Sequence, residues 1–168
     1  MGVVVRGEGA GDRWAVRAVN EAAFGGCDEA DLVLRLHDEA DALFGLVAEV
    51  EGLLVGHVLF SRLPIEVGDR IVAAAALAPL AVLPGRQGRG IGSALVWQGL
   101  DRCREQRVPA VVVLGNPAYY GRFGFHAETA ARLQTPWPGP NLMAIELIPG
   151  GLAGGEGVAR YAAAFSGV

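Results

Sequence analysis

The chain has 168 residues, of which 52% are apolar and 19% charged, and this composition excludes a disordered protein. The length is enough to bury one core, so we expect a single domain over residues 1–168, with its core at about 3–148 and a C-terminal tail at 149–168. The formal net charge of −4 argues against a nucleic-acid-binding protein, whose surface normally carries a basic face.

No segment is typical of a membrane protein or a metal site. The longest apolar run, Ile71 to Leu83, has 13 residues and includes Pro79, so it is too short to span a bilayer. Because the N-terminus lacks a basic stretch followed by a long apolar segment, we expect no signal peptide and a cytoplasmic location. Cys27 and Cys103 lie outside any Cys-x-x-Cys or Cys/His cluster, which predicts neither a disulfide framework nor a bound metal. Cys103 falls on the apolar stripe of an expected helix and is interpreted as a core residue.

The N-terminal part of the chain predicts a strand, two helices separated by a glycine break, and a pair of strands. Asp12 is a suitable N-cap for the first helix. The tight Glu51-Gly52 link between the paired strands is typical of a β-hairpin. The expected elements are a strand at 3–7, helices at about 12–24 and from 28 onward, and strands at about 43–51 and 53–62.

The second part of the chain predicts a βαβ unit followed by shorter elements. Pro84-Gly85 ends a long strand, and apolar residues recur at helical spacing in the segment after it. Val108 to Leu114 is an almost continuous apolar run, which is typical of a parallel strand covered on both faces. The tail either packs as a final strand or stays mobile. The expected elements are a strand at 70–83, a helix at about 90–107, a strand at 108–114, a short helix near 117–122, and strands near 124–128 and 142–148.

A glycine-rich turn between the strand at 70–83 and the next helix is the most informative segment. Its glycines let the backbone approach a ligand, and the helix N-terminus supplies N–H groups and partial positive charge, which together suit a pyrophosphate. Arg86 and Arg89 add charge that could pair with phosphate oxygens. The Walker A lysine is missing, and the glycine spacing does not fit a dinucleotide fingerprint. A helix-entry turn without a ligand is the alternative. The segment reads Pro84-Gly85-Arg86-Gln87-Gly88-Arg89-Gly90-Ile91-Gly92-Ser93.

Two motifs resemble the GNAT acetyltransferase superfamily. The segment Gln87-Gly88-Arg89-Gly90-Ile91-Gly92 matches the Q-x-x-G-x-G signature at every fixed position. The segment 116–125 is similar to the second motif of the family, which ends in Tyr-x-x-x-Gly-Phe. The sequence segments at 77–84, 119–125 and 157–161 resemble those of the YhbS-like branch of predicted N-acetyltransferases. The likeness covers nearly the whole chain.

The resemblance implies an α/β (α+β) fold: one domain with a mixed, mostly antiparallel central sheet, helices on both faces and a splayed pair of parallel strands. The wedge between the splayed strands would admit the pantetheine arm of coenzyme A. Pro79 supports this expectation, because proline lacks an N–H for the ladder and belongs at a bulge or an edge. A break there would leave backbone groups from Leu80 to Leu83 for the pantetheine amides. An ordinary edge strand is the alternative.

The resemblance also implies an acetyl-CoA-dependent enzyme without a metal. A neutral amine would attack the thioester, a backbone N–H near Ala81 and Val82 would meet the oxyanion, and a tyrosine would protonate the leaving thiolate. By motif position this general acid is Tyr120, with Tyr119 as the runner-up. Asn116 departs from the family spacing and is kept as a cofactor contact. The expected cofactor-binding residues are Leu80, Ala81, Val82, Arg86, Gln87, Gly88, Arg89, Gly90, Ile91, Gly92, Ser93, Asn116 and Tyr119.

The general base and the acceptor are less defined. The strand at 70–83 has no ionisable residue from Ile71 onward, so Glu49, Glu51 or His57 could act through a water chain, or no single residue is the base. For His57 a structural histidine with satisfied hydrogen bonds is the preferred interpretation. Residues 12–41 hold eight carboxylates, which form either an acidic rim for a cationic amine or, as we prefer, a solvated helix face. The acceptor is an unidentified primary amine of a small molecule or peptide, and a homodimer is one option for the oligomeric state.

Two other classes of protein compete with the enzyme. The missing base carboxylate also suits a module that binds acyl-CoA without turnover, which an assay of thiol release would reveal. The glycine-rich turn alone would suit a nucleotide-binding protein, which would bind ATP or NAD in preference to coenzyme A.

Overall fold

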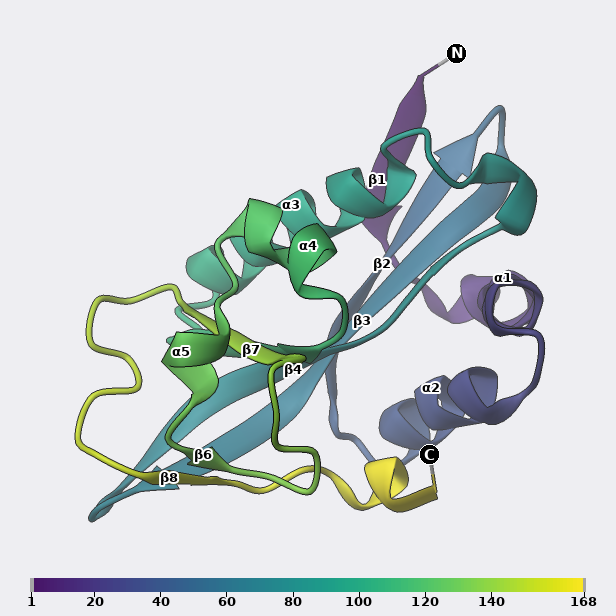
Figure 1. The fold of residues 1–168 in the computed structure, drawn as a ribbon. Helices are drawn as coiled ribbons and strands as arrows, with labels where there is room; N and C mark the ends of the chain where they lie inside the picture. Colours follow the sequence, from purple (N-terminus) through teal and green to yellow (C-terminus); the bar gives the residue numbers. More distant parts are fainter. Residues whose placement is uncertain (1, 168) are drawn as a thin grey trace. The chain divides into compact units, whose positions relative to one another are not determined.

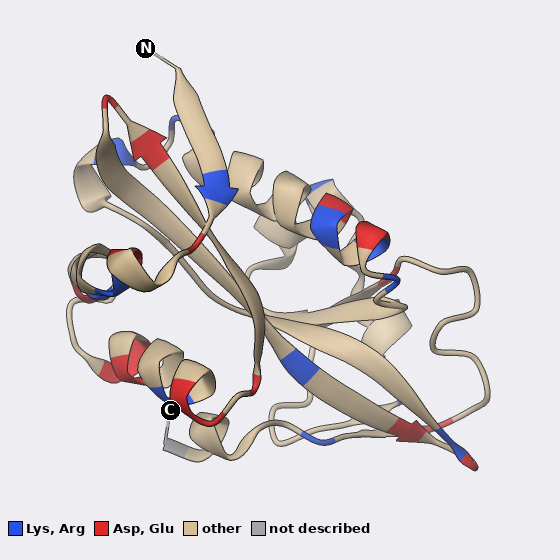
Figure 2. Ribbon diagram, turned by 180° about the vertical axis from the view of Figure 1, so that it is seen from behind, with Lys and Arg blue, Asp and Glu red and all other residues tan. Residues whose placement is uncertain are grey.

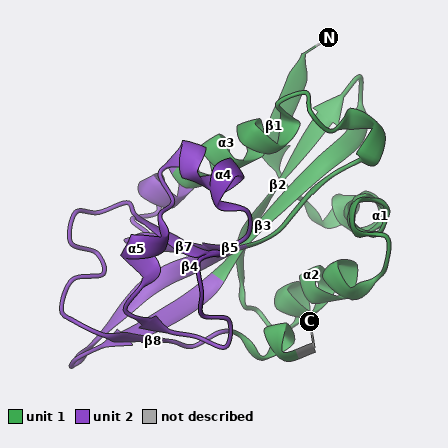
Figure 3. Cartoon of the chain, in the orientation of Figure 1, with its two compact units in different colours: residues 1–61, 78–100, 162–168 green, residues 62–77, 101–161 purple. Residues whose placement is uncertain are grey.

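The computed structural model describes residues 2–167, which divide into two compact units (Figure 3). Unit 1 comprises the residues up to 61, residues 78–100 and those from 162 onward, and unit 2 comprises residues 62–77 and 101–161. No helix within residues 2–167 is long and apolar enough to cross a lipid bilayer. In chain order (Figure 1) the elements are β1 (Val3–Gly7), the 3-10 helix η1 (Ala10–Asp12), α1 (Arg13–Phe24), α2 (Asp28–Asp38), β2 (Ala42–Val50), β3 (Leu53–Val67), β4 (Arg70–Val82), η2 (Pro84–Arg86), α3 (Ile91–Glu105), β5 (Ala110–Leu114), α4 (Pro117–Tyr120), η3 (Gly121–Phe123), α5 (Ala127–Ala130), β6 (Leu133–Gln134), β7 (Leu142–Glu146), β8 (Gly157–Ala159) and η4 (Ala163–Gly167).

The sheet of unit 1 is antiparallel and starts with the N-terminal strand. β1 pairs with β2, with Val3 opposite Val50, and β2 pairs in turn with the first part of β3. The link between β2 and β3 is the expected hairpin. Glu51 and Gly52 have φ of 52° and 77°, the positive values that a tight two-residue hairpin turn requires.

Helices cover both faces of this sheet. Successive residues of a strand point to opposite faces. On β3, a Cβ at Gly56 would meet Ile91 and Leu95 of α3. The next residue, His57, contacts Asn20 of α1. The first turns of α3 and the helix α1 therefore lie on opposite faces, as the resemblance implies.

Unit 2 contains parallel as well as antiparallel strand pairs. β4 and β5 run parallel, with Ala75 opposite Val111, and β7 pairs antiparallel with β5 along its whole length. The buried residues from Ala110 to Val113 confirm the expected apolar strand next to a parallel neighbour. The connection β4–α3–β5 is the expected βαβ unit. β6 and β8 are also parallel, whereas β1–β2, β2–β3, β3–β8 and β5–β7 are antiparallel, so the sheet is mixed and mostly antiparallel.

The structure changes the expected bounds of two strands. Residues 124–128 do not form the expected strand, because Gly124 turns the chain at φ 100° and α5 begins soon after. His126 makes an isolated bridge to Ala144 instead. β3 extends beyond the expected end at 62 to Val67, since its last residues pair with β8. Of the two alternatives for the tail, packing as a final strand is thereby confirmed at 157–159.

Asp12 has a different role from the expected helix cap. It stands directly before α1, but its backbone is already helical (φ −89°, ψ −9°) and its side chain makes no cap bond. Its carboxylate instead accepts hydrogen bonds from the Gly9 N–H at 2.7 Å and from the Arg6 guanidinium at 2.7 and 2.9 Å. These bonds hold the short turn η1 that leads into α1.

Candidate functional site

The glycine-rich turn lies in unit 1, between the end of β4 and the start of α3. Gly88 and Gly90 have φ of 75° and 81°, and a Cβ at either would meet no heavy atom within 4 Å. Both positions therefore need glycine for backbone conformation and not for space. The Gln87 side chain donates from Nε2 to the Val82 carbonyl at 3.0 Å, which ties the turn to β4. Ala94 N–H bonds to the Gly90 carbonyl, so the first helical turn directs its backbone N–H groups out of the helix end.

Two arginines of this turn line a cavity. Two guanidinium groups against one carboxylate give the cavity an excess of positive charge, and the N-terminus of α3 adds a partial positive charge. Such a site suits phosphate oxygens. Glu51, one of the three candidate bases, is the carboxylate beside these arginines. The cavity has a volume of about 280 Å³ and is lined by Val3, Val50, Glu51, Arg86, Arg89 and Ile91.

The end of β4 offers fewer open backbone groups than expected. Of residues 80–82, Ala81 is buried and its two neighbours are half-buried. The Val82 carbonyl accepts the glutamine amide of the turn, and the Leu83 N–H donates to the Val55 carbonyl at 2.9 Å. Both groups already have hydrogen-bond partners within the protein. The backbone groups expected to bind the pantetheine amides are therefore the other N–H and carbonyl groups of residues 80–83.

The second motif lies in unit 2, directly after β5. Asn116 caps the short helix α4: its Oδ1 accepts a hydrogen bond from the Ala118 N–H at 2.9 Å, and Pro117 occupies the first helical turn. Its carbonyl oxygen accepts hydrogen bonds from the N–H groups of Tyr119 and Tyr120, each at 3.0 Å. Asn116 thus orients both candidate tyrosines through the backbone.

The two tyrosines have different surroundings. The Tyr120 ring packs edge-on against Phe125 and Tyr119, with ring centroids 5.8 and 5.0 Å away. Burial, and to a smaller extent Tyr119, raises the pKa of the Tyr120 hydroxyl to about 12. Tyr119 instead places its ring 4.7 Å from the Arg122 guanidinium, in a cation–π contact. Tyr120 is therefore a half-buried tyrosine whose hydroxyl keeps its proton at neutral pH.

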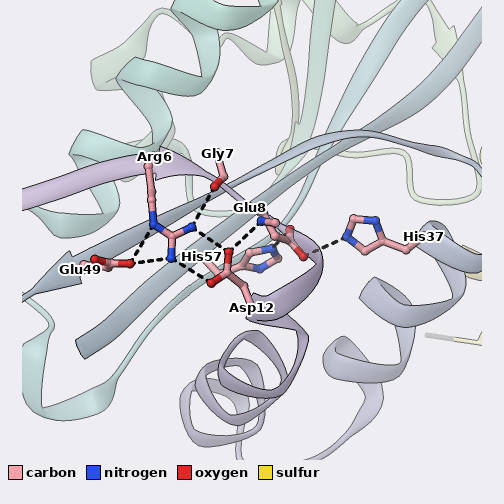
Figure 4. A network of polar contacts seen from close by, with 8 residues as sticks. Arg6, Gly7, Glu8, Asp12, His37, Glu49 and His57 are labelled. Atoms are coloured by element: carbon pink, nitrogen blue, oxygen red, sulfur yellow. Dashed lines mark hydrogen bonds and ion pairs between the residues drawn. The ribbon is translucent and has the colours of Figure 1, made fainter. Parts of the chain in front are cut away.

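A buried polar network in unit 1 centres on Glu8, the residue that follows β1 (Figure 4). Its Oε1 accepts from His57 Nε2 at 2.9 Å and its Oε2 from His37 Nε2 at 3.0 Å. Burial raises the pKa of Glu8, but the hydrogen bonds from His37 and His57 outweigh burial, and the pKa falls to about 2. Glu8 and His37 also line a cavity of about 170 Å³ beside α1 and α2. Sequence patterns carried no signal for Glu8, because its partners lie 29 and 49 positions away.

Asn20 orients the ring of His57 from the side opposite Glu8. Its Nδ2 donates to the Val16 carbonyl at 2.9 Å and contacts His57 Nδ1 at 3.2 Å. An amide nitrogen only donates, so Nδ1 accepts, and Nε2 carries the ring proton that is donated to Glu8. His57 is fully buried and engaged at both nitrogens, which confirms the structural interpretation. It has no open lone pair with which to act as a base.

Arginines lie among the carboxylates of α1 and α2 (Figure 2). Several form ion pairs between exposed side chains, which favours the solvated helix face over a concentrated acidic rim. Glu49, the remaining candidate base, accepts a hydrogen bond from Arg6 Nε at 2.8 Å. The ion pairs on the two helices join Arg13 to Asp38, Arg17 to Glu21 and Asp31, and Arg35 to Glu39.

The two cysteines differ in their surroundings, because Cys27 is exposed and Cys103 lies in the core. Cys103 is fully buried, and burial raises the pKa of its thiol to about 12, which confirms its interpretation as a core residue. Within residues 2–167, no three His, Cys, Asp or Glu side chains are arranged to hold a metal ion.

The sequence is similar to known acetyltransferases. Residues 9–127 match the family described as Acetyltransferase (GNAT) domain. The chain is 38% identical over 129 residues to the uncharacterized N-acetyltransferase YhbS of Escherichia coli strain K12, a stretch that covers 76% of each protein. It is 40% identical over 112 residues to the uncharacterized N-acetyltransferase YjhQ of the same strain, covering 66% of this chain and 62% of YjhQ.

Two solved structures are similar along almost the whole chain. The crystal structure of YhbS from Escherichia coli in complex with CoA has a TM-score of 0.88 at 34% identity and covers 98% of this chain and 92% of its own. That of a GNAT family acetyltransferase from Brucella melitensis in complex with acetyl-CoA has a TM-score of 0.80 at 32% identity and covers 98% of both chains. The class is thereby established: this chain belongs to the GNAT acetyltransferase family and is an acyltransferase. Within the family it is similar to YhbS, as the segments at 77–84 and 119–125 indicated.

Proposed function

We propose that this chain transfers the acetyl group of acetyl-CoA to a primary amine of a small molecule or peptide, with Tyr120 as the general acid. Family membership and the two similar structures that hold CoA and acetyl-CoA support the donor. The chain's own residues add support, because the turn of Gly88 and Gly90 combines a helix N-terminus with Arg86 and Arg89 in one anion site. Linked phosphates are the natural ligand of such a site.

The proposed reaction balances without a further co-reactant. The amine nitrogen forms a bond to the thioester carbonyl carbon, and the C–S bond breaks when the tetrahedral intermediate collapses. The nitrogen loses one proton and the sulfur gains one. A backbone N–H near Ala81 and Val82 is proposed to stabilise the oxyanion of the intermediate. No single protein base is required if the amine binds as its neutral form, which agrees with the engaged nitrogens of His57.

The observation that carries the role of Tyr120 is its position four residues before Gly124 in the second motif, with its ring packed against Phe125 and Tyr119. The hydroxyl of Tyr120, with its pKa raised to about 12, holds its proton throughout the neutral range. A thiol has an ordinary pKa of about 8.5, so the phenol is the weaker acid. Its donation is therefore a hydrogen bond that strengthens as negative charge builds on the departing sulfur, and the proton that the sulfur gains overall balances the one that the amine nitrogen releases. Such groups contribute about 10²–10⁴-fold to a rate.

An assay of thiol release tests the proposal. Purified protein is mixed with acetyl-CoA and, in turn, an alkylamine, a polyamine and a peptide with a free N-terminus, and release of the CoA thiol is measured. We expect turnover with at least one amine. Tyr120→Phe should lower kcat by about 10²-fold with little change in the KM for acetyl-CoA, since only the proton donor is lost. Tyr161→Phe, which removes the hydroxyl of a tyrosine packed against Trp137, is the matched control and should keep the wild-type kcat.

Each other outcome points to a different conclusion. If Tyr119→Phe lowers kcat while Tyr120→Phe does not, the general acid is Tyr119. If CoA binds tightly but no amine releases thiol, the chain is an acyl-CoA-binding module. If CoA does not bind, the donor assignment itself is wrong.

A further inference from the structure

Gly115 makes an unusually close approach to the ring of Tyr120. It follows β5 directly and lies five positions before that tyrosine. A Cβ built on Gly115 would stand 2.5 Å from Tyr120 Cε2 and 3.0 Å from its Cδ2. Real Cβ contacts almost never fall below 3.0 Å, so any other residue at 115 would force a movement. The backbone of Gly115 is outside the left-handed region, which means that space and not conformation requires the glycine.

We propose that Gly115 is a positioning residue for Tyr120: its missing side chain lets the tyrosine ring rest against the backbone at the end of β5 and so sets where the hydroxyl points. This inference rests on the proposed function, in which that hydroxyl donates to the departing sulfur. Gly115 itself contributes no group to the reaction.

If a side chain were added at position 115, the Tyr120 ring would move and the backbone of residue 115 would stay in place. The Gly115 N–H donates to the Asn141 carbonyl at 3.0 Å, and the preceding residue, Leu114, is paired with Leu142 of β7. The backbone is thus held from the β7 side. To restore an ordinary carbon–carbon separation of about 3.5 Å, the near edge of the Tyr120 ring must move by about 1 Å.

The neighbours of the ring limit where it can go. Phe125 and Tyr119 stand edge-on to it, and the ring of Phe123 is 6.4 Å away between centroids. Because these neighbours are closely packed, we expect the Tyr120 ring to rotate into a new orientation rather than to shift within its plane. Misplacement of a reacting group by about 1 Å can cost about 10²-fold in rate.

Gly115→Ala, with Gly121→Ala as the matched control, tests the inference. Gly121 belongs to the same motif, has a helical φ of −58° and has no heavy atom within 4 Å of an added Cβ, so alanine fits there. With acetyl-CoA and the best amine of the three described above, Gly115→Ala should lower kcat by at least about 10-fold and change the KM for acetyl-CoA by less than about 2-fold. Gly121→Ala should match the wild type. A wild-type kcat for Gly115→Ala overturns the inference.

A double-variant cycle separates failure of this inference from failure of the proposed function. If Gly115 acts through the Tyr120 hydroxyl, Gly115→Ala should have no further effect on kcat in the Tyr120→Phe background. A full additional loss in that background means that Gly115 acts by another route, which overturns the inference alone. If Tyr120→Phe by itself leaves kcat unchanged, the general-acid role fails, whatever Gly115 does.

An NMR experiment tests the same inference without an amine acceptor and also detects misfolding. In protein with ¹³C-labelled tyrosine rings, the Tyr120 resonance is identified by its loss in Tyr120→Phe. We expect Gly115→Ala to shift this resonance and to weaken its ring contacts to Phe125, while the Tyr161 resonance stays in place. Gly121→Ala should leave both unchanged. An unshifted Tyr120 resonance in Gly115→Ala contradicts the inference even if the rate falls.

Discussion

Glu8 shows at the scale of one residue how a charge is kept inside the protein. Its side chain is only 4% exposed, and an isolated carboxylate at such a position would become protonated. His37 and His57 each donate to one of its oxygens, and Asn20 completes the hydrogen bonding of His57. The histidines stand on α2 and β3 and Asn20 on α1, so this one side chain links β1 to three further elements of unit 1.

Glu8→Gln tests the contribution of this charge to stability. The pKa of Glu8 is lowered from 4.5 to about 2 in the folded protein. A lowered carboxyl pKa stabilises the folded state above the unfolded value, and this contribution is lost as the pH falls from about 4.5 toward 2. The shift corresponds to about 3 kcal/mol. We therefore expect Glu8→Gln to lower the free energy of unfolding by up to about 3 kcal/mol at neutral pH, and the deficit to shrink near pH 3.

Urea unfolding at the two pH values measures this difference. Glu105→Gln removes an exposed carboxylate at the end of α3 and is the control, which should stay close to the wild type at both pH values. A Glu8→Gln variant as stable as the wild type at neutral pH would show that the network does not depend on the charge.

At the scale of elements, the turn between β4 and α3 depends on two backbone conformations that L side chains rarely adopt. A non-glycine residue in the left-handed region costs about 1–2 kcal/mol. Gly90, at φ 81°, is directly followed by the first residue of α3, so strain there disturbs the helix end that is proposed to hold the phosphates. Gly85, in the same turn, has no positive φ and no atom near an added Cβ.

Gly90→Ala and Gly85→Ala form a matched pair for calorimetric titration with coenzyme A. Alanine at position 90 is strained, and distortion of the turn would relieve that strain. We therefore expect Gly90→Ala to raise the Kd for CoA by about 10-fold, which corresponds to about 1.4 kcal/mol of binding free energy. Gly85→Ala should bind like the wild type. Equal affinities for the two variants would show that the conformation at 90 is not needed for binding.

At the scale of the whole molecule, a ligand that binds only the folded state stabilises it by mass action. Acetyl-CoA at about 100 times its Kd should add about 2.7 kcal/mol to the free energy of unfolding. Thermal unfolding should therefore shift upward with acetyl-CoA and with CoA, and ATP and NAD at the same concentration should have little effect, since the turn lacks the Walker A lysine and the dinucleotide spacing. A larger shift with ATP or NAD than with CoA would support the nucleotide-binding alternative.

Features that depend on neighbouring residues along the chain could be predicted from the amino-acid sequence. The Glu51-Gly52 hairpin, the β4–α3–β5 unit and the glycine-rich turn each come from local backbone preferences and apolar spacing, and the two motifs were sufficient to predict the family. Features that depend on residues far apart in the sequence, or on close packing, became visible only in the folded chain. Sequence spacing does not reveal that Glu8 meets His57 from 49 positions away, that β3 continues because β8 pairs with it, or that Gly115 leaves room for a ring. This difference arises because local propensity is additive along the chain, whereas hydrogen-bond partners and packing space are set only when the chain has folded.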